Sequence, residues 1–459
     1  MRVIAKREGA PFCDAQVRWR KFRWRWRGRS RRLKSDGGHV CVANGKPQLM
    51  RRAEDVAPKP GPDLSLLLTE TEKQQALFLR RLEALVRVES PSSDKAAVDQ
   101  ALRLFGGWAE EAGGTLRWHR NRTFGDSLEV RFGRVSSQHR PVMLLGHLDT
   151  VWECGTLEGM PWTMTGIEIR GPGVLDMKAG ALMALTAMEV LRTLGLKHVP
   201  VILLLHGDEE VGSPASRRVT ERVARRCRAV YVLEPAQGES GAYKTARKAV
   251  GMYRLAVQGI AAHSGVDFER GHSAIVELAH QIEVVTDWTD LPRGITVNAG
   301  RMGGGTRSNV VAAEAWAEVD VRAARSGHVA ELERKFRSLK PRDPGCRLLI
   351  TGGMNRPPME RTAATVALFR RAQAIGRQIG IRLEEAATGG GSDGNFTSAL
   401  GVPTLDGMGA VGSGAHATHE HVRREHLVPR TVLLAALLLE TGDTMSSLAS
   451  VSPRSSLPG

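Results

Sequence analysis

The alternation of apolar and polar positions predicts a series of helices and short buried strands. Glu72–Val88 has its apolar residues three and four positions apart, which is typical of a helix with one buried face. The segment SPSSD at Ser90–Asp94 follows, and it predicts a second helix that begins with a Ser or Asp cap and ends near Ala112. Toward the end of the chain, Thr362–Ile379 and Arg430–Thr441 show the same helical pattern.

Short, continuous apolar runs predict strands that are buried on both faces. Three of them are Pro141–Gly146, Val201–Leu205 and Ala229–Leu233, and the helical segment Met177–Leu194 lies between the first two. This alternation of strands and helices predicts an α/β fold whose sheet is mixed, mainly parallel and flanked by helices. Open α/β sheets place their sites beyond the carboxyl ends of the strands, so the residues after each run are the first candidates for function.

The pattern changes from about Lys244 onward, where the strands and helices become those of a smaller unit. We predict an α+β domain at residues 244–356, inserted into a first domain made of residues 65–243 and 357–445. Residues 1–64 and 446–459 are predicted to be disordered tails. The segments expected in the inserted domain are strands at Gly251–Gln258, Ile295–Ala299, Glu314–Arg322 and Leu348–Thr351, and helices at Ser273–Trp288 and His328–Leu339.

The composition is that of a globular protein. Hydrophobic residues make up 42 % of the 459 residues, yet no apolar run approaches the roughly 18 residues of a membrane span. The five cysteines form no CxxC pair or disulfide framework, which predicts a reducing compartment. The N-terminal segment has no apolar core of about 7–15 residues, as a secretory signal would, so we expect a cytoplasmic protein.

The formal net charge of +16 resembles that of a nucleic-acid-binding protein, but it is concentrated in one place. Residues 1–60 contain 17 Lys and Arg against 5 Asp and Glu, whereas the rest contains 48 against 44, so no nucleic-acid binding is expected of the body. The Arg/Trp-rich run Arg18–Arg32 could bind nucleic acid or an anionic membrane surface. The simpler alternative is a disordered segment, or an extension created by too early a start codon, since Met50 lies just before the first foldable segment.

Polar residues follow the predicted buried strands, and a run of carboxylates stands near the end of one of them. Asp208, Glu209 and Glu210 come soon after the apolar run, and buried carboxylates are costly unless a cation satisfies them. Imidazole and carboxylate ligands together suit zinc, manganese or cobalt. We therefore predict a metal centre from five segments: His147 and Asp149 in GHLDTV, Asp176 in GPGVLDMKAG, the pair Glu209–Glu210, Glu234 in VLEP, and His416 in GSGAHATHE.

Each of these residues has a simpler explanation when it is taken alone. His147 and Asp149 could form an ordinary polar pair, and Asp176 could be the N-cap of the following helix. The Glu209–Glu210 pair could belong to a solvated loop, Glu234 could be a charge at a strand end, and His416 could lie in a mobile glycine-rich loop. Their joint occurrence favours the metal centre. Within it, an extended segment would put His147 and Asp149 on one face, so that Asp149 accepts the second N–H of the imidazole.

Six motifs together resemble the di-zinc amidohydrolase and peptidase superfamily, which includes glutamate carboxypeptidase, acetylornithine deacetylase, succinyl-diaminopimelate desuccinylase and aminoacylase. They are GHLDTV, GPGVLDMKAG, GDEEVGS, LEP, GGGSDGN and GAHATHEHV, and the resemblance covers roughly residues 66 to 440. It implies two divalent metal ions, Zn²⁺ first, with Co²⁺ or Mn²⁺ as alternatives. The implied ligands are a bridging residue, Asp176, and two pairs that complete the two metal shells, His147 with Glu234 and Glu210 with His416.

The resemblance also assigns roles next to the metals. It implies that Asp149 orients His147, and that Glu209 is the general base, which takes a proton from the attacking water and passes it to the leaving amine. Three further histidines stay open: His419 and His421 as rivals for the late ligand, and His206, which the pattern does not explain.

Residues of the inserted domain are implied to complete the site. The resemblance implies that this domain forms a homodimer, and that His263 in GIAAHSG stabilises the tetrahedral oxyanion, often across the dimer. Within the superfamily the sequence is most similar to the glutamate carboxypeptidase branch, and an arginine can clamp a carboxylate with two hydrogen bonds. The residues implied to bind the substrate carboxylate are Asn298, Arg322 and Arg356, beside the turn Gly389–Gly391 with Ser392 and Asp393.

Together these implications predict a metal-dependent hydrolase that releases a C-terminal amino acid, with glutamate as the first candidate, from an N-acyl or peptidyl substrate. The alternative with the same chemistry is a deacylase of N-acyl diamino or basic amino acids. An alternative of another class is a nucleic-acid or membrane-surface binding protein that acts through residues 18–32. The expected partners are a small N-acyl amino acid or short peptide and a second copy of the chain.

Overall fold

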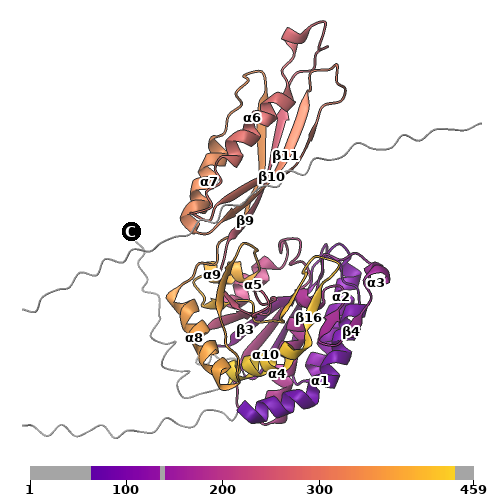
Figure 1. Ribbon diagram of the computed structural model, residues 1–459, viewed down its shortest axis with the longest axis vertical. Helices are drawn as coiled ribbons and strands as arrows, with labels where there is room; N and C mark the ends of the chain where they lie inside the picture. The colour runs from indigo at the N-terminus through magenta and orange to yellow at the C-terminus, as the bar shows by residue number, and fades with distance from the viewer. Residues whose placement is uncertain (1–63, 135–139, 440–459) are drawn as a thin grey trace, which may run out of the picture. The chain divides into compact units, whose positions relative to one another are not determined.

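The computed structural model of the chain describes residues 64–134 and 140–439 (Figure 1). The predictions for the two tails fall outside these ranges, apart from Leu64, which begins the first helix. Within the described ranges, none of the helices is both long and apolar enough to cross a membrane.

The first two helices follow directly from their sequence patterns. α1 (Leu64–Arg87) buries a stripe of apolar side chains, and α2 (Lys95–Glu111) begins at one of the predicted caps. The side chain of Asp94 accepts the backbone N–H groups of Ala96 and Ala97, at 2.9 and 3.1 Å, which have no partner inside the helix. Both predicted helices are confirmed, with Asp94 as the cap of the second.

A six-stranded sheet runs in the order β1-β2-β6-β3-β7-β14. β3 pairs in parallel with β6 and β7, and β14 pairs in parallel with β7, whereas β1 and β2 join antiparallel at one edge. The predicted α/β class, with a mixed and mainly parallel sheet, is confirmed. The strands are β1 (Thr115–His119), β2 (Ser127–Phe132), β3 (Val142–His147), β6 (Val201–His206), β7 (Ala229–Val232) and β14 (Thr404–Leu405).

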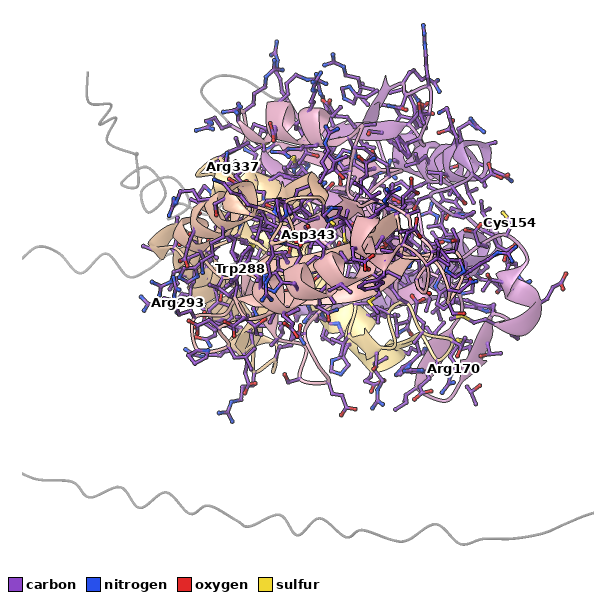
Figure 2. The ribbon with its side chains drawn as sticks, turned by 90° about the horizontal axis from the view of Figure 1, so that it is seen from above. Cys154, Arg170, Trp288, Arg293, Arg337 and Asp343 are labelled. Carbon is purple, nitrogen blue, oxygen red and sulfur yellow. The ribbon has the colours of Figure 1, made fainter. Side chains whose placement is uncertain are left out.

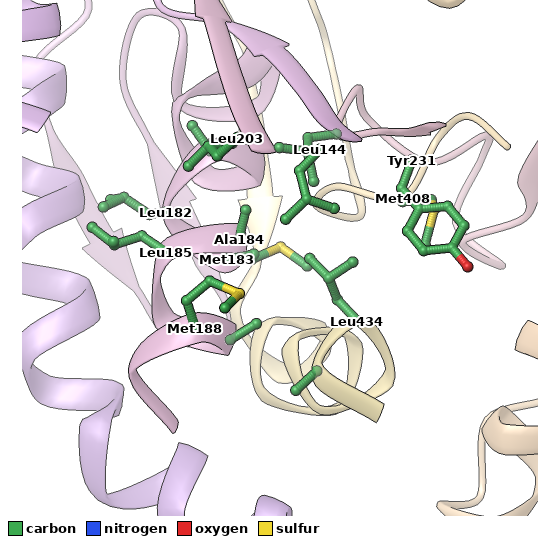
Figure 3. Close-up of a cluster of buried hydrophobic side chains, with 14 of the residues drawn as sticks. Leu144, Leu182, Met183, Ala184, Leu185, Met188, Leu203, Tyr231, Met408 and Leu434 are labelled. Carbon is green, nitrogen blue, oxygen red and sulfur yellow. The ribbon is translucent and has the colours of Figure 1, made fainter. Parts of the chain in front are cut away.

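Both faces of this sheet are buried, which explains the continuous apolar runs of the sequence. Leu144 of β3 and Leu203 of β6 pack with α4 (Ala179–Thr193) and α10 (Leu427–Leu438), as Figure 3 shows. Met143 and Leu145 of β3 join a separate cluster on the other face, with α5 (Arg217–Ala224). Further helices complete the layers, since α1 contacts α4 and α10, and α8 (Ala363–Gln378) contacts α10.

A second sheet is antiparallel, and its four strands run in the order β10-β11-β9-β12. In the sequence these strands come after β7 and before β14, both of which belong to the first sheet. The helices α6 (Ala274–Thr286) and α7 (Ser326–Ser338) pack on it, and α6 is capped by Ser273. Side chains along the central strand β9 alternate between buried and less buried positions, as a sheet covered on one face requires. The strands are β9 (Ala249–Gln258), β10 (Thr296–Gly304), β11 (Glu314–Ala323) and β12 (Arg347–Arg356).

The core of this smaller sheet is built around three aromatic rings. Tyr253 of β9 stacks on Phe336 of α7, with ring centroids 3.7 Å apart. Trp288, labelled in Figure 2, meets Phe336 edge to face at 5.0 Å. The predicted α+β elements are therefore all present, and the predicted domain boundaries at residues 244 and 356 stay a prediction.

Some elements differ from the sequence-based expectation. The helix predicted at Met177–Leu194 begins at Ala179, because η1 (Val174–Lys178), in which Asp176 leaves helical geometry, precedes it. Several short strands of two to five residues were not predicted, since so few residues show too little periodicity to identify a strand. They are β4 (Thr163–Thr165), β5 (Glu168–Arg170), β15 (Gly412–Ser413) and β16 (His421–Arg423), which pair as one sheet, and β8 (Tyr243–Arg247), which pairs in parallel with β13 (Glu385–Thr388).

The cysteines of the described ranges form no disulfide. Cys227 and Cys346 are buried, and Cys154 is exposed (Figure 2).

Candidate metal centre

Three parallel strands bring their carboxyl ends to one edge of the sheet. β3 lies between β6 and β7 and ends at His147. Asp208–Glu210 follow β6 after one residue, and Glu234 follows β7 after one residue. The side chains predicted from separate segments are thus brought together by the sheet topology.

The two carboxylate oxygens of Asp176 face two different histidines. Oδ1 of Asp176 lies 3.3 Å from Nε2 of His147, and Oδ2 lies 3.5 Å from Nε2 of His416. A second carboxylate stands beside each imidazole: Oε1 of Glu234 is 3.6 Å from His147, and Oε2 of Glu210 is 3.1 Å from His416. The five residues predicted as metal ligands therefore form one cluster with Asp176 at its middle.

Two buried atoms of this cluster have no hydrogen-bond partner among the residues that the structure describes. They are Nε2 of His147 and Oδ1 of Asp176. Buried polar atoms without partners are costly, and a divalent cation would satisfy both. The nitrogen and oxygen donors are those that zinc, manganese and cobalt accept, so the residues present fit such an ion.

The charges of the cluster favour a cation as well. Burial lowers the pKa of His147, but its contacts with Asp149, Asp176 and Glu234 raise that pKa well above the ordinary value. Burial and the nearby charge of Asp176 raise the pKa of Glu210 to about 7, although His416 opposes this. The site thus carries an excess of negative charge that attracts a positive ion, whether a proton or a metal.

Asp149 holds two parts of the centre at once. Nδ1 of His147 donates to the backbone carbonyl of Asp149 at 3.0 Å and lies 3.4 Å from its carboxylate. That carboxylate accepts the backbone N–H groups of Glu209 and Glu210, at 3.2 and 3.1 Å, and the hydroxyl of Ser92 at 2.7 Å. The sequence indicated the contact with His147, whereas the bonds to the Glu209–Glu210 backbone and to Ser92 had no signal in it.

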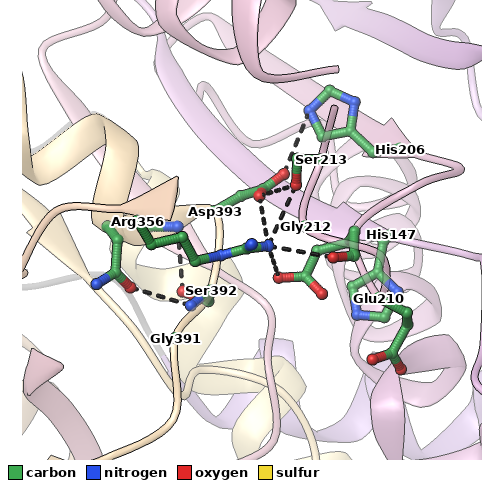
Figure 4. Close-up of polar contacts among 12 residues, drawn as sticks. His147, His206, Glu210, Gly212, Ser213, Arg356, Gly391, Ser392 and Asp393 are labelled. Carbon is green, nitrogen blue, oxygen red and sulfur yellow. Dashed lines mark hydrogen bonds and ion pairs between the residues drawn. The ribbon is translucent and has the colours of Figure 1, made fainter. Parts of the chain in front are cut away.

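Glu209, the predicted general base, contacts Arg356, whose guanidinium and its hydrogen bonds are drawn in Figure 4. Nη2 of Arg356 is 2.5 Å from Oε1 of Glu209, and the same nitrogen donates to Asp393 at 3.1 Å and to Ser213 at 3.2 Å. Burial raises the pKa of Glu209, and the charge of Arg356 opposes that rise. Arg356 was predicted to bind the substrate carboxylate; here the residue is 6 % exposed and its guanidinium is bound to protein groups, so that role stays a prediction.

His206, which the motifs left unexplained, has a structural role. Its two ring nitrogens bond the hydroxyls of Ser127 and Thr220, at 2.8 and 2.7 Å. Burial lowers the pKa of His206 to about 3, so the ring is neutral and supplies one donor and one acceptor. Ser213, which lies between this ring and Arg356 in Figure 4, donates a short hydrogen bond to Asp393.

A buried arginine that sequence reasoning missed lies behind Glu234. Arg247 donates to both carboxylate oxygens of Asp406, at 2.8 and 2.6 Å, and its Nη2 lies 3.6 Å from Oε2 of Glu234. It also donates to the backbone carbonyls of Gly390 and Gly391, which ties the predicted glycine turn to the centre. Nothing in the spacing of Arg247 relative to these partners could have signalled the contact.

Apart from Arg356, which contacts Glu209, the residues predicted on the inserted domain stand apart from the metal cluster. Among the described residues, no hydrogen bond or ion pair joins His263 or Asn298 to it. His263 is exposed, and its Nδ1 accepts the N–H of Gly265 at 3.1 Å, which leaves the proton on Nε2. Arg322 pairs with Asp320 at 2.7 Å and reaches the carbonyl of Gly389 at 3.4 Å.

His419 and His421, the alternatives to His416 as a metal ligand, lie away from the cluster. Nδ1 of His421 donates to the carbonyl of His419 at 3.0 Å, and its Nε2 is 3.9 Å from Glu168. Within the ranges that the structure describes, neither histidine pairs with Asp176 or Glu210, as His416 does. The geometry therefore favours His416.

Solved structures of several peptidases have the same fold. The aminopeptidase PepT of Bacillus cereus is 20 % identical with a TM-score of 0.66, and the match covers 79 % of this chain and 98 % of that one. The M20 family metallo-carboxypeptidase Sso-CP2 of Sulfolobus solfataricus is 17 % identical with a TM-score of 0.61, over 79 % and 98 % of the two chains. At these identities the likeness shows the fold alone.

Sequence comparisons identify the family. Carboxypeptidase G2 of Pseudomonas sp. (strain RS-16) is 25 % identical over 386 residues, which are 82 % of this chain and 92 % of that protein. Succinyl-diaminopimelate desuccinylase of Acidovorax ebreus is 25 % identical over 342 residues, 70 % and 84 % of the two. A sequence model of peptidase family M20/M25/M40 matches residues 143–440. The residue types that can bind a metal lie together at one edge of the sheet, within the matched range. The chain belongs to peptidase family M20/M25/M40 and is an enzyme of the metallopeptidase kind.

Proposed function

We propose that the protein hydrolyses an amide bond and releases a C-terminal amino acid, with glutamate as the first candidate, from an N-acyl or peptidyl substrate. The observation that carries this proposal is the placement of Asp176 between His147 and His416, with Glu209 next to the cluster. The similarity to carboxypeptidase G2 supports the choice of a carboxypeptidase.

The proposed cofactor is a pair of divalent cations, with Zn²⁺ first. Bound there, they would polarise the substrate carbonyl and make water a stronger nucleophile at neutral pH. The residues proposed to hold them are His147, Asp176, Glu210, Glu234 and His416.

The chain's own residues would move the protons. Glu209 would take one proton from the attacking water as the new C–O bond forms. It would then give that proton to the amine nitrogen as the C–N bond breaks, so that an acid and a free amine leave. Asp149 supports this role because its carboxylate fixes the backbone of Glu209.

Substrate binding is proposed for residues near the glycine turn. Arg356, Arg322 and Asn298 would provide the cationic and amide groups for the substrate carboxylate. Arg322 contacts the turn, and Arg356 lies close to it as well, since a Cβ on Gly391 would come within 2.8 Å of Cδ of Arg356. His263, whose Nδ1 accepts the N–H of Gly265, would donate a hydrogen bond from Nε2–H to an oxyanion, from the same or a second copy of the chain.

A homodimer through the inserted domain and a cytoplasmic location complete the proposal. Large apolar side chains exposed on the inserted domain support the dimer, because an interface there would bury them: Val276 is exposed at 68 %, Met302 at 73 % and Phe268 at 63 %. Light scattering on the purified chain tests this, and a strict monomer would contradict it.

One hydrolysis panel tests the function. The full chain, loaded with zinc, is incubated with N-acyl-glutamate, N-acyl-alanine, N-acyl-leucine and N-acetyl-ornithine, and the released amino acids are quantified. We expect glutamate to be released fastest. Glu209→Gln should be slower by about 100-fold or more, because the general base is lost. Glu239→Gln, which changes an exposed carboxylate, serves as the matched control.

The other outcomes discriminate the alternatives. A preference for N-acetyl-ornithine would assign the protein to the deacylases. The similarity to succinyl-diaminopimelate desuccinylase supports this alternative. No turnover of any substrate by metal-loaded protein would overturn the proposal and bring forward the binding protein that acts through residues 18–32, which lie outside the described residues.

A further inference from the structure

Glu420 is fully buried, and each of its carboxylate oxygens accepts two N–H groups. Oε2 accepts Nε1–H of Trp152 at 2.8 Å and the backbone N–H of Gly173 at 3.1 Å. Oε1 accepts the backbone N–H groups of Leu175 and Asp176, at 2.8 and 3.1 Å. Four hydrogen bonds on one carboxylate exceed what a cap or a turn requires, so this residue joins parts of the chain rather than ending a single element.

The four donors and Glu420 belong to three segments that carry the metal centre. Trp152 lies three residues after Asp149, on the loop that follows β3. Gly173, Leu175 and Asp176 form the turn that presents Asp176 to both histidines. Glu420 itself belongs to the loop that presents His416. One side chain therefore binds the loops of three different ligand groups to one another.

The link between Glu420 and His416 is short and hydrogen-bonded. The N–H of Glu420 donates to the carbonyl of Ala417, and the N–H of Ala417 donates to that of Gly414, both at 2.8 Å. His416 has a φ of 62°, in the left-handed region that non-glycine residues seldom adopt. Such a conformation persists only where its surroundings hold it, and Glu420 anchors this loop from inside the protein.

We propose that Glu420 is a positioning residue that fixes Asp176 and His416 relative to each other and so sets the affinity of the centre for metal. The inference rests on the proposed function, in which both residues are metal ligands. Partners behind metal ligands orient them, and removing such a partner typically lowers metal affinity about 10- to 100-fold.

Glu420→Gln is the sharpest test because the amide has nearly the same shape as the carboxylate. An amide NH₂ group cannot accept a hydrogen bond. In either orientation of the Gln side chain, this group replaces an oxygen that accepts from two N–H donors, so two of the four hydrogen bonds are lost. The matched control is Glu277→Gln. Glu277 is a buried carboxylate of the inserted domain that accepts the backbone N–H groups of Arg342 and Asp343 and an N–H of Gln281.

The measurement is zinc affinity, by competition with a chromophoric chelator, on the full chain, together with thermal unfolding. Both variants should unfold at lower temperature. We expect Glu420→Gln to bind zinc at least about 10-fold more weakly than the wild type, and Glu277→Gln to stay within about twofold of it. Wild-type affinity in a folded Glu420→Gln protein would overturn the inference.

A second variant covers the case in which Glu420→Gln does not fold. Trp152→Phe keeps an aromatic side chain and removes a single N–H donor. Zinc binding weakened about threefold or more would support the inference, and unchanged binding would overturn it. If the wild type binds no zinc at all, the proposed function fails first; if the wild type binds zinc and these variants bind it equally well, only the role of Glu420 fails.

Discussion

Arg356 donates a hydrogen bond to Glu209, with Nη2 of the guanidinium 2.5 Å from Oε1 of the carboxylate. The guanidinium comes from the end of β12, whereas the carboxylate follows β6, so the pair connects the smaller sheet to the edge of the larger one. Asp393 and Ser213 accept from the same nitrogen. Arg356 thus orients the predicted base and is itself held by Asp393 and Ser213.

This pairing predicts how Arg356→Lys behaves. A lysine has no planar fork and cannot serve Glu209, Asp393 and Ser213 from one fixed position. We expect kcat on N-acyl-glutamate to fall about 10-fold or more, because the base loses its orientation. The measurement is steady-state kinetics with kcat and KM determined separately. An unchanged kcat with only a raised KM would contradict the role toward Glu209 and leave Arg356 as a substrate contact alone.

Arg247 leads to a prediction about stability. Its guanidinium is buried and is the only ion-pair partner that the described residues offer to Asp406, so Arg247→Gln leaves a buried carboxylate without its charge partner. We expect a loss of about 3–5 kcal/mol in the free energy of unfolding. Denaturant titration with metal chelated measures this.

The control for Arg247 is another arginine and carboxylate pair of the same chain. Arg361 pairs with Glu385 at 2.8 Å, but its side chain is 52 % exposed. Arg361→Gln should cost less than about 1 kcal/mol, because solvent screens an exposed pair. Equal losses for the two substitutions would show that burial does not decide the difference.

The sequence was sufficient for the features that depend on local pattern. The runs that became β3 and β6 are apolar because helices cover both faces of the sheet, and parallel pairing then brings His147 and Glu234 to one edge. Arg247 and Glu420 could not be found in this way. Their partners are backbone groups and side chains as far as 268 residues away, and no spacing records such contacts.

Glu129 of β2 predicts how stability depends on pH. Burial raises its pKa, but hydrogen bonds from His119 and Arg131 outweigh this and lower the pKa to about 2, from an ordinary value of 4.5. A lowered pKa means that the unfolded chain takes up the proton first as the pH falls. The stabilisation, about 3 kcal/mol at most, is therefore complete well above pH 4.5 and disappears between about pH 4.5 and 2.

Comparing the wild type with Glu129→Gln checks this sign. With metal chelated, the difference in unfolding free energy between them should be largest at pH 7 and should shrink from about pH 4.5 downward. Urea titrations at pH 7, 4 and 3 measure it. A difference that grows toward low pH would mean that the carboxylate is not held ionised by its two partners.

The metal centre predicts a stability that depends on zinc. Nε2 of His147 and Oδ1 of Asp176 are buried and have no hydrogen-bond partner within the described part of the chain, so an ion that satisfies them binds the folded chain and stabilises it by mass action. Free zinc at 100 times Kd should add about 2.7 kcal/mol, seen as a higher unfolding temperature that chelation reverses. His416→Ala should reduce this gain, because it removes the imidazole shared by Asp176 and Glu210, whereas His421→Ala should keep it. The opposite result, with the gain lost in His421→Ala and kept in His416→Ala, would contradict this assignment. It would show that His421 of β16, and not His416, is the metal ligand in this part of the chain.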